Sequence, residues 1–244
     1  MKVTLLFSLS LFFVYSTTTA QTVSYSNDAV QLAARVVNSS NVAAEIPEHL
    51  IHSIHDALMA VAEDNSQEAY LVAQTHNIHT FKRVNTSTVH LMVDANAGWL
   101  TKLLAGKSKI GNVPFTNLLE RYNLKVSVLD ELEDIKMLEI TSDQPMNMKF
   151  IANELSMIDD VFMTEVPLPS GDGSDIDIKK VEGGWMITYH LKYDNCESLC
   201  KYDHYWQFGV TDASQVSFLG EYGSDLSTYI DKTPNYSVVK TESK

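Results

Sequence analysis

Apolar side chains recur at helical spacing in the segment that follows Pro47. They fall three or four positions apart, which places them on one face of an α-helix. These apolar positions are Leu50, Ile51, Ile54, Ala57, Leu58 and Val61. Proline is favoured in the first turn of a helix, and the polar run at 64–66 ends the pattern. We therefore predict an amphipathic helix between these two points.

A shorter helix is predicted before it, at residues 29–37. Asn27 or Asp28 would cap its first turn, because a short polar side chain can accept a hydrogen bond from a free backbone N–H group. Residues 21–27 are expected to form a loose lead-in to this helix.

The chain changes pattern at 88–166, where residues that alternate between apolar and polar flank helical stretches. Strands are predicted at 89–93, 124–129, 135–140 and 161–166, and helices at 99–104, 114–122 and 147–157. The resulting order, β-α-β-β-α-β, is that of a ferredoxin-like fold. We expect one antiparallel sheet with helices on a single face.

A turn-rich linker at 167–175 leads into a second strand-rich region at 176–230. Its apolar and aromatic runs predict an antiparallel β-meander, with a tight turn at Gly183-Gly184. The fold class is therefore α+β. The predicted domains are a helical region at 21–87, the ferredoxin-like domain at 88–166, and the meander, which is followed by a polar tail at 231–244.

The first twenty residues have the pattern of a secretory signal peptide. Lys2 precedes an apolar run from Leu5 to Tyr15, and small residues end at Ala20. The run is shorter than the roughly 20 residues that span a membrane. We therefore expect export, to the extracellular space or the periplasm, as a chain that begins at Gln21 and has no membrane anchor.

The charge of the chain excludes several partners. The formal net charge is −13, and it becomes −14 once Lys2 is removed with the leader. Such acidity repels phosphate backbones and anionic membranes, and no basic stripe compensates it. We expect a protein or a glycan as partner, and neither a nucleic acid nor a cofactor.

Cys196 and Cys200 are the only cysteines. In an oxidising compartment the simplest state of such a pair is a disulfide. A bridge across so short a loop adds about 2 kcal/mol at most. A redox or metal pair is the weaker alternative, because the spacing is C-x3-C and no second cysteine pair completes a zinc site.

Several histidines and aspartates are candidate metal ligands. The histidines are His49, His52, His55, His76 and His79. A helix has 3.6 residues per turn, so each step of three residues falls about 60° short of a full turn. Two such steps separate His49 from His55, and these two side chains therefore do not share a face. Polar-face histidines are therefore the alternative to a zinc site. Asp172, Asp175 and Asp177 could attract Ca²⁺ through oxygen ligands, but they lack the order of a calcium loop, and aspartate is also an ordinary turn residue.

Aromatic residues are dense in the second half of the chain, and they supply the candidate binding residues Trp185, Tyr205, Trp206 and Phe208. At a period of two, Tyr205 lies on one face of its strand and Trp206 with Phe208 on the other. One face would pack in the core and the other could stack on a sugar or a peptide.

The chain contains no nucleophile elbow, β-lactamase set, phosphate-binding loop or dinucleotide fingerprint. The lack of these motifs favours a secreted binding or interaction protein, and we predict no catalytic residue. Two alternatives stay open: an inhibitor or propeptide-like protein directed at peptidases, and a metal-dependent hydrolase that uses His49, His52, His76 or His79. Three glycosylation sequons, at Asn38, Asn85 and Asn235, matter only if the host glycosylates exported proteins.

Two resemblances follow from these motifs. The 88–166 pattern resembles subtilisin propeptides and related inhibitors. The order of Gly171-Asp-Gly173, Trp185, the Cys pair and His204-Tyr-Trp-x-Phe208 resembles a group of uncharacterised secreted proteins of Bacteroidota, as do the stretches at 78–81 and 117–122. The second resemblance implies export and this architecture, and it implies no catalytic residue.

Overall fold

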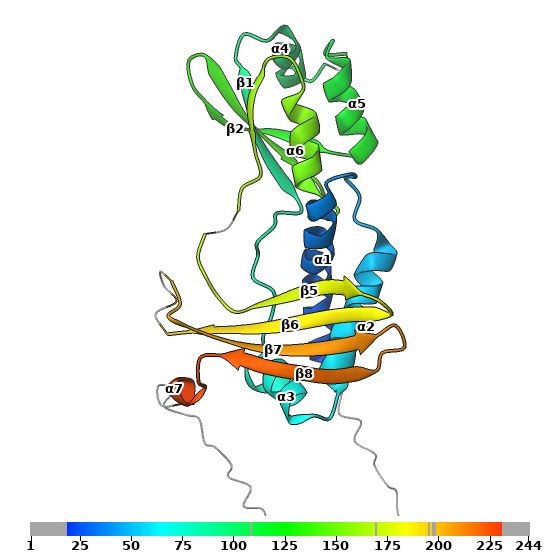
Figure 1. Cartoon of the computed structure of the whole chain (residues 1–244). Helices are drawn as coiled ribbons and strands as arrows, with labels where there is room; N and C mark the ends of the chain where they lie inside the picture. The colour runs from blue at the N-terminus through cyan, green and yellow to red at the C-terminus, as the bar shows by residue number, and fades with distance from the viewer. Residues whose placement is uncertain (1–18, 108, 169, 195, 197–198, 231–244) are drawn as a thin grey trace, which may run out of the picture.

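The computed structural model describes the whole chain except residues 1–18, 108, 169, 195, 197–198 and 231–244. It contains two antiparallel four-stranded sheets, each with helices packed on one face (Figure 1). The α+β class is therefore confirmed. The predicted leader at 1–20 lies almost wholly outside the described residues, as does the polar tail.

Two long helices open the described chain. α1 spans Thr19–Ser40, so residues 21–27 belong to a helix and the prediction of a loose lead-in there was wrong. α2 spans Glu48–Glu63 directly after Pro47, and it buries the apolar face that the spacing predicted. A turn of helix at Gln67–Tyr70 (α3) continues as a π-helical turn at Leu71–Thr75 (η1), which the sequence pattern did not reveal.

The four C-terminal strands form one meander, in which each strand pairs with the next. They are β5 (Asp175–Val181), β6 (Gly184–Tyr193), β7 (Tyr202–Thr211) and β8 (Val216–Gly223). Gly183 adopts a φ of 73° in the tight turn between β5 and β6. Gly184 must also lack a side chain, because a Cβ there would lie 2.1 Å from the Val210 carbonyl oxygen.

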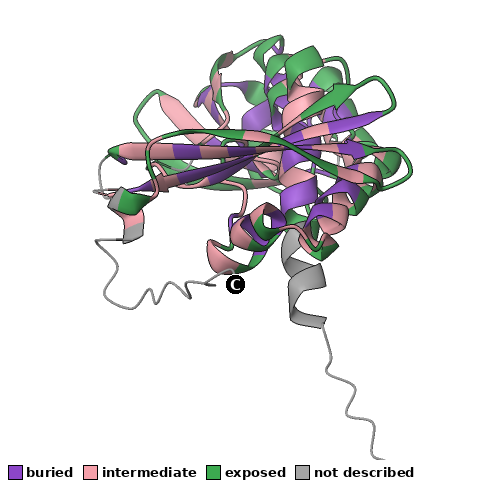
Figure 2. Cartoon of the chain, turned by 60° about the horizontal axis from the view of Figure 1, so that its bottom comes forward, coloured by how far each residue is buried: buried purple, intermediate pink, exposed green. Residues whose placement is uncertain are grey.

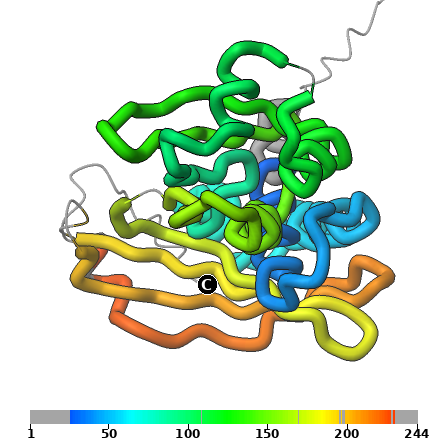
Figure 3. Tube along the Cα trace, turned by 90° about the horizontal axis from the view of Figure 1, so that it is seen from above, coloured from blue at the N-terminus to red at the C-terminus, as the bar shows by residue number. Residues whose placement is uncertain are grey.

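The inward face of this sheet shares one apolar core with α1 and α2. Leu32 from α1, Leu58 from α2, Tyr189 from β6 and Trp206 from β7 are all fully buried in it. Figure 3 shows the blue and cyan N-terminal helices beside the yellow and orange strands, although about 120 residues separate them in the sequence. The helical region at 21–87 and the meander at 176–230 thus form a single packed unit.

The intervening segment folds around a core of its own. Its strands are β1 (Thr88–Asp94), β2 (Lys125–Glu131), β3 (Ile135–Thr141) and β4 (Val161–Glu165), in the spatial order β2-β3-β1-β4. Its helices are α4 (Gly98–Leu104), α5 (Val113–Tyr122) and α6 (Met148–Ser156), on one side of the sheet. The separate core includes Leu91, Phe115, Leu138 and Ile151. This unit is inserted between η1 and β5 of the other.

Asn147 joins the two units. Its side-chain Nδ2 donates to the Ala43 carbonyl oxygen at 3.0 Å, and its backbone N–H donates to that of Ala44 at 2.7 Å. Its Oδ1 also caps α6 by accepting from the Phe150 N–H group. Asn147 is 2% exposed. Figure 2 shows that buried residues gather where the helices meet the strands. The loop between α1 and α2 is therefore held against the inserted unit.

The last described helix, α7, spans Ser227–Ile230 beyond the end of β8. Within the residues that the structure covers, no helix is both long enough and apolar enough to cross a membrane. A disulfide joins Cys196 to Cys200 in the loop between β6 and β7, which confirms the predicted pairing.

Candidate binding surface

The candidate histidines do not converge. His49 and His52 line a pocket of about 330 Å³ between α2, the start of β6, and the end of β7 with the turn that follows it. His76 is half-buried and lies against Trp206 and Tyr229, with ring centroids 5.5 and 5.2 Å away. His79 bonds Asp28, with Nδ1 and Oδ2 2.7 Å apart. Among the described residues, no three His, Cys, Asp or Glu side chains are grouped to hold a metal ion.

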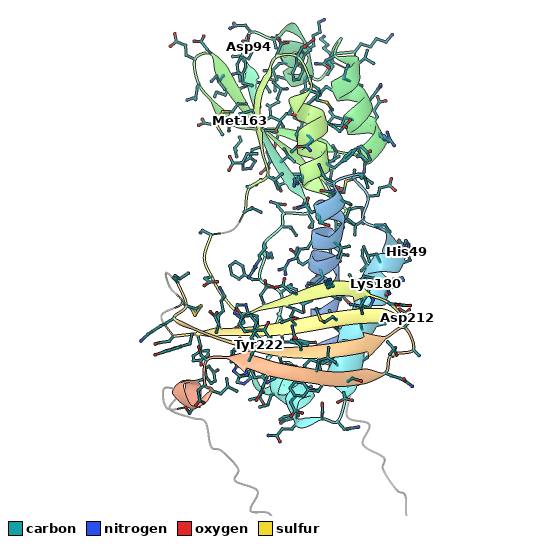
Figure 4. All side chains as sticks on the ribbon, in the orientation of Figure 1. His49, Asp94, Met163, Lys180, Asp212 and Tyr222 are labelled. Carbon is teal, nitrogen blue, oxygen red and sulfur yellow. A yellow bond between two sulfur atoms is a disulfide. The ribbon has the colours of Figure 1, made fainter. Side chains whose placement is uncertain are left out.

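Hydrogen bonds and an ion pair fill the walls of the pocket that His49 and His52 line. Trp185 donates from Nε1 to Ser53 Oγ at 2.9 Å. Lys180 pairs with Asp212 at 2.9 Å, and its ammonium lies 4.6 Å from the centre of the Trp185 ring. Figure 4 shows His49, Lys180 and Asp212 together at one end of the sheet. The Trp185–Ser53 bond thus fastens α2 to the sheet, and the Lys180–Asp212 pair joins β5 to the turn after β7.

Basic side chains neutralise the three aspartates that were candidate calcium ligands, which corrects that prediction. Asp172 accepts from Lys192 Nζ at 2.5 Å, and this bond holds the pKa of Asp172 below its usual value. Asp175 is fully buried and pairs with Arg35 at 2.8 Å and with Arg83 at 2.7 Å. Asp177 pairs with Arg35 at 3.2 Å. Asp175 and Asp177 thereby fix the edge of β5 to α1 and to the segment around residue 83, and Asp172 joins the segment before β5 to β6.

Three of the four aromatic binding candidates lie in the core. Trp185 is 4% exposed, and Trp206 and Phe208 are fully buried. No ligand from solvent can stack on them, so their place on a binding surface was predicted wrongly. Tyr205 points to the opposite face of the sheet, as its odd position requires, and is half-buried.

Tyr205 is the middle ring of a stack that crosses three strands on the outer face. Its ring lies 4.0 Å from that of His190 on β6, with 18° between the planes. It lies 4.7 Å from the Tyr222 ring on β8, with 9° between the planes. The three residues occupy one register row. We call the rings of His190, Tyr205 and Tyr222 the aromatic ladder.

Charged groups surround the ladder. Asp203 accepts from His190 Nε2 at 2.7 Å, which orients the imidazole. Burial and the negative charge of Asp203 raise the pKa of the Tyr205 phenol, and the positive charge of Arg83 acts in the opposite direction. The phenol therefore stays protonated at neutral pH and can donate a hydrogen bond.

The ladder ends at Tyr222, on the edge of the sheet. Tyr222 is 51% exposed, and Leu219, three residues earlier on β8, is 56% exposed. In the part of the chain that the structure describes, no strand pairs with the outer side of β8. At the other edge, Arg35 donates to the Ile176 carbonyl oxygen on β5 at 2.7 Å and so occupies part of that strand. Figure 4 shows Tyr222 away from the end of the sheet that carries His49.

The sequence interpretation missed two of the three ladder residues. Of the three, only Tyr205 is among the candidate binding residues that the sequence supplies. His190 lies on β6 within an apolar and aromatic run, and Tyr222 lies near the end of β8, which continues to Gly223. The available signal was the two-residue period, which places His190, Tyr205 and Tyr222 on the outer face once the register is known.

Comparisons with models of protein families, with curated proteins and with solved structures find no match to this chain. The resemblance to secreted proteins of Bacteroidota therefore stays a prediction.

Proposed function

We propose that the protein is exported and binds an extended segment of another polypeptide along β8, with an aromatic side chain of that segment stacked on Tyr222. The observation that carries the proposal is the aromatic ladder, which ends at β8, an edge strand beside which the described residues place no further strand. Export is supported by the pattern of residues 1–20 and by the Cys196–Cys200 disulfide.

The spacing of the ladder supports a strand as the ligand. The ring centroids of Tyr205 and Tyr222 are 4.7 Å apart, which equals the roughly 4.7–4.9 Å between hydrogen-bonded strands. A strand added beside β8 would place its own side chains at the next repeat of this spacing. An aromatic residue in register with Tyr222 would therefore extend the ladder by one ring.

The backbone of β8 supplies the remaining interactions. An edge strand presents N–H and C=O groups that an extended peptide can satisfy, and the pockets for alternate side chains give specificity. Leu219 packs over Gly209, with its side-chain atoms 3.6 Å from where a Cβ of Gly209 would lie. It thereby offers an apolar contact farther along β8, because Gly209 is four residues from Tyr205 on β7.

Charge further defines the ligand. Asp203 lies next to the ladder and acts on the Tyr205 phenol through its negative charge. Together with the net charge of −13 over the whole chain, this carboxylate favours a neutral or basic segment over an acidic one. We expect a peptide that combines one aromatic residue with lysine or arginine.

The test measures the binding of short fluorescent peptides that alternate β-branched residues and carry a central tyrosine with lysines at the ends. We expect Tyr222→Ala to weaken binding roughly tenfold. Tyr70→Ala is the matched control, because Tyr70 is 62% exposed on α3, away from the ladder. N-methylation of the peptide residues whose backbone N–H groups face β8 should abolish binding. N-methylation of the alternate residues, whose N–H groups face away from β8, should not.

Two outcomes would contradict the proposal. One is peptide binding that Tyr222→Ala leaves unchanged. The other is binding of neutral oligosaccharides, and of no peptide, to the aromatic ladder, since a sugar ring can also stack on an exposed tyrosine.

The inhibitor hypothesis rests on the inserted unit. We assign this unit to the ferredoxin-like class, on the strength of its strand order β2-β3-β1-β4. That class includes subtilisin propeptides, but one fold serves many functions. An assay against extracellular serine proteases tests the hypothesis, and the absence of inhibition at micromolar protein would exclude it. The hydrolase hypothesis has no comparable support, because His49 and His52 lie apart from His76 and His79.

A further inference from the structure

Three methionines form one register row on the sheet of the inserted unit. Met137 on β3 is directly opposite Met92 on β1, and Met92 is directly opposite Met163 on β4. The chain has nine methionines in all, so a third of them occupy this row. Strands favour β-branched and aromatic residues, and β-propensity therefore does not account for the concentration. We call Met92, Met137 and Met163 the methionine row.

The methionine row lies on the open face of the sheet. The neighbours of Met92 along β1, Leu91 and Val93, point to the helices and are buried in the core, so Met92 points the other way. Met163 is 43% exposed, and it is labelled in Figure 4 on the side away from α5 and α6. Small molecules and ions in solution can reach this face.

Both irregularities of the sheet fall at this row. The register between β1 and β4 shifts between Met92 and Val93, which leaves Phe162 as the extra residue. The register between β2 and β3 shifts between Val128 and Asp130, so that Asp130 comes opposite Met137. Bulges bend a strand and re-aim the side chains beside them. The two bulges therefore curve the sheet where the three thioethers lie.

We propose that the methionine row binds one Cu(I) ion through its three sulfur atoms. Thioethers are soft ligands that select Cu(I) over the harder divalent cations. Residues directly opposite in antiparallel strands have Cβ atoms about 4.5–5.5 Å apart. The three rotatable bonds of methionine allow the sulfur atoms of the outer two residues to meet that of Met92 over the middle strand.

The next row of the same face supports a cation. His90 lies between Glu139 and Glu165, with its Nε2 3.7 Å from Glu139 Oε1. These carboxylates create a negative potential beside the thioethers, and Asp130 adds to it at the β2 end of the methionine row. His90 is two residues from Met92 on the same face, so its imidazole is available as a fourth ligand. An apolar partner docked here would instead have to cover several charges.

The first test is a titration of the purified protein with Cu(I) under anaerobic conditions, in competition with a chromophoric Cu(I) chelator. We expect one equivalent of Cu(I) to be retained and Met92→Leu to weaken binding by at least about tenfold. Leucine keeps the apolar volume and removes only the sulfur. Met157→Leu is the control and should bind like the parent, because Met157 is 70% exposed at the end of α6 and outside the methionine row.

A second readout identifies the ligands directly. Ag(I) is a redox-inert probe of the same site, and we expect it to shift the methyl resonances of Met92, Met137 and Met163 in an NMR spectrum of methyl-labelled methionine. The Met157 resonance should stay in place. The proposal is overturned if the chelator removes all Cu(I), if Met92→Leu binds Cu(I) like the parent, or if Ag(I) shifts Met157 as much as the methionine row.

Discussion

Tyr205 and Tyr222 lie on adjacent strands with their rings nearly parallel, 9° between the planes and 4.7 Å between the centroids. Their Cα atoms are direct cross-strand partners, so the antiparallel register of β7 and β8 brings the rings together. The contact links the middle of the sheet to its free edge. The stack therefore rigidifies the surface that we propose as the binding site.

The first prediction concerns the coupling between these two rings. Aromatic pairs contribute about 0.5–1.5 kcal/mol beyond the area that they bury. We expect a double-mutant cycle with Tyr205→Ala and Tyr222→Ala to give a coupling energy in this range, measured by urea unfolding. Additive effects of the two substitutions would show that the rings are neighbours without a stabilising contact.

The second prediction concerns the buried ion pair between Arg35 and Asp175. Arg35 donates to Asp175, to the Ile176 carbonyl oxygen and to the Phe81 carbonyl oxygen, and thereby joins α1, β5 and the segment before β1. Breaking a buried pair costs about 3–5 kcal/mol, because the remaining charge loses its partner. We expect Arg35→Ala to lower the free energy of unfolding by about 3 kcal/mol, since Arg83 still faces Asp175.

Lys125→Ala is the matched control for Arg35→Ala. Lys125 pairs with Asp143 at 2.6 Å, but both side chains are more than half exposed. Exposed pairs contribute less than about 1 kcal/mol. Equal losses of stability in the two variants would show that burial gives the Arg35 pair no special weight.

The third prediction concerns acid stability and His76. Burial lowers the pKa of His76 from 6.5 to about 4, and the nearby His204 acts in the same direction. Between these two pH values the unfolded chain binds a proton that the folded chain does not, so stability falls as the pH falls. We expect the free energy of unfolding to drop more steeply from pH 6.5 to 4.5 in the parent than in His76→Phe. Parallel pH curves would contradict this assignment.

The fourth prediction has the opposite sign and concerns His79. Its hydrogen bond to Asp28 raises the pKa of His79 above 6.5, and this outweighs its partial burial. The added stability is fully present below about pH 6.5 and is lost as the pH rises through the folded-state pKa. We expect the difference in unfolding free energy between the parent and His79→Gln to shrink from pH 6 to pH 8. A difference that grows over this range would exclude the charged pair.

Several local features of the fold were predictable from the sequence. The helix after Pro47 forms where the apolar spacing placed it, because burial of one helical face decides both its existence and its orientation. The strands of the inserted unit lie within a few residues of the predicted ranges. Tyr205 and Trp206 lie on opposite faces of β7, because strand geometry alone requires it.

The sites were less predictable, because they depend on residues that are distant in the sequence. The charge of Asp175 indicated an ion ligand, and only the folded chain brings Arg35, 140 residues away, within 2.8 Å. Trp206 was a candidate for stacking on a ligand until α1 and α2 proved to cover its face of the sheet. Spacing along the chain does not reveal which face of a sheet a distant helix will cover.

By itself, the sequence determined the α+β class, most of the elements and the pairing of Cys196 with Cys200, since local periodicity and the supply of only two cysteines are sufficient for these. Tertiary structure alone decided that the N-terminal helices and the C-terminal strands share one core around an inserted unit. It also decided that the aromatic ladder and the methionine row each cross three strands. The physical reason is strand register, which depends on the packing of whole faces and therefore on contacts across the entire chain.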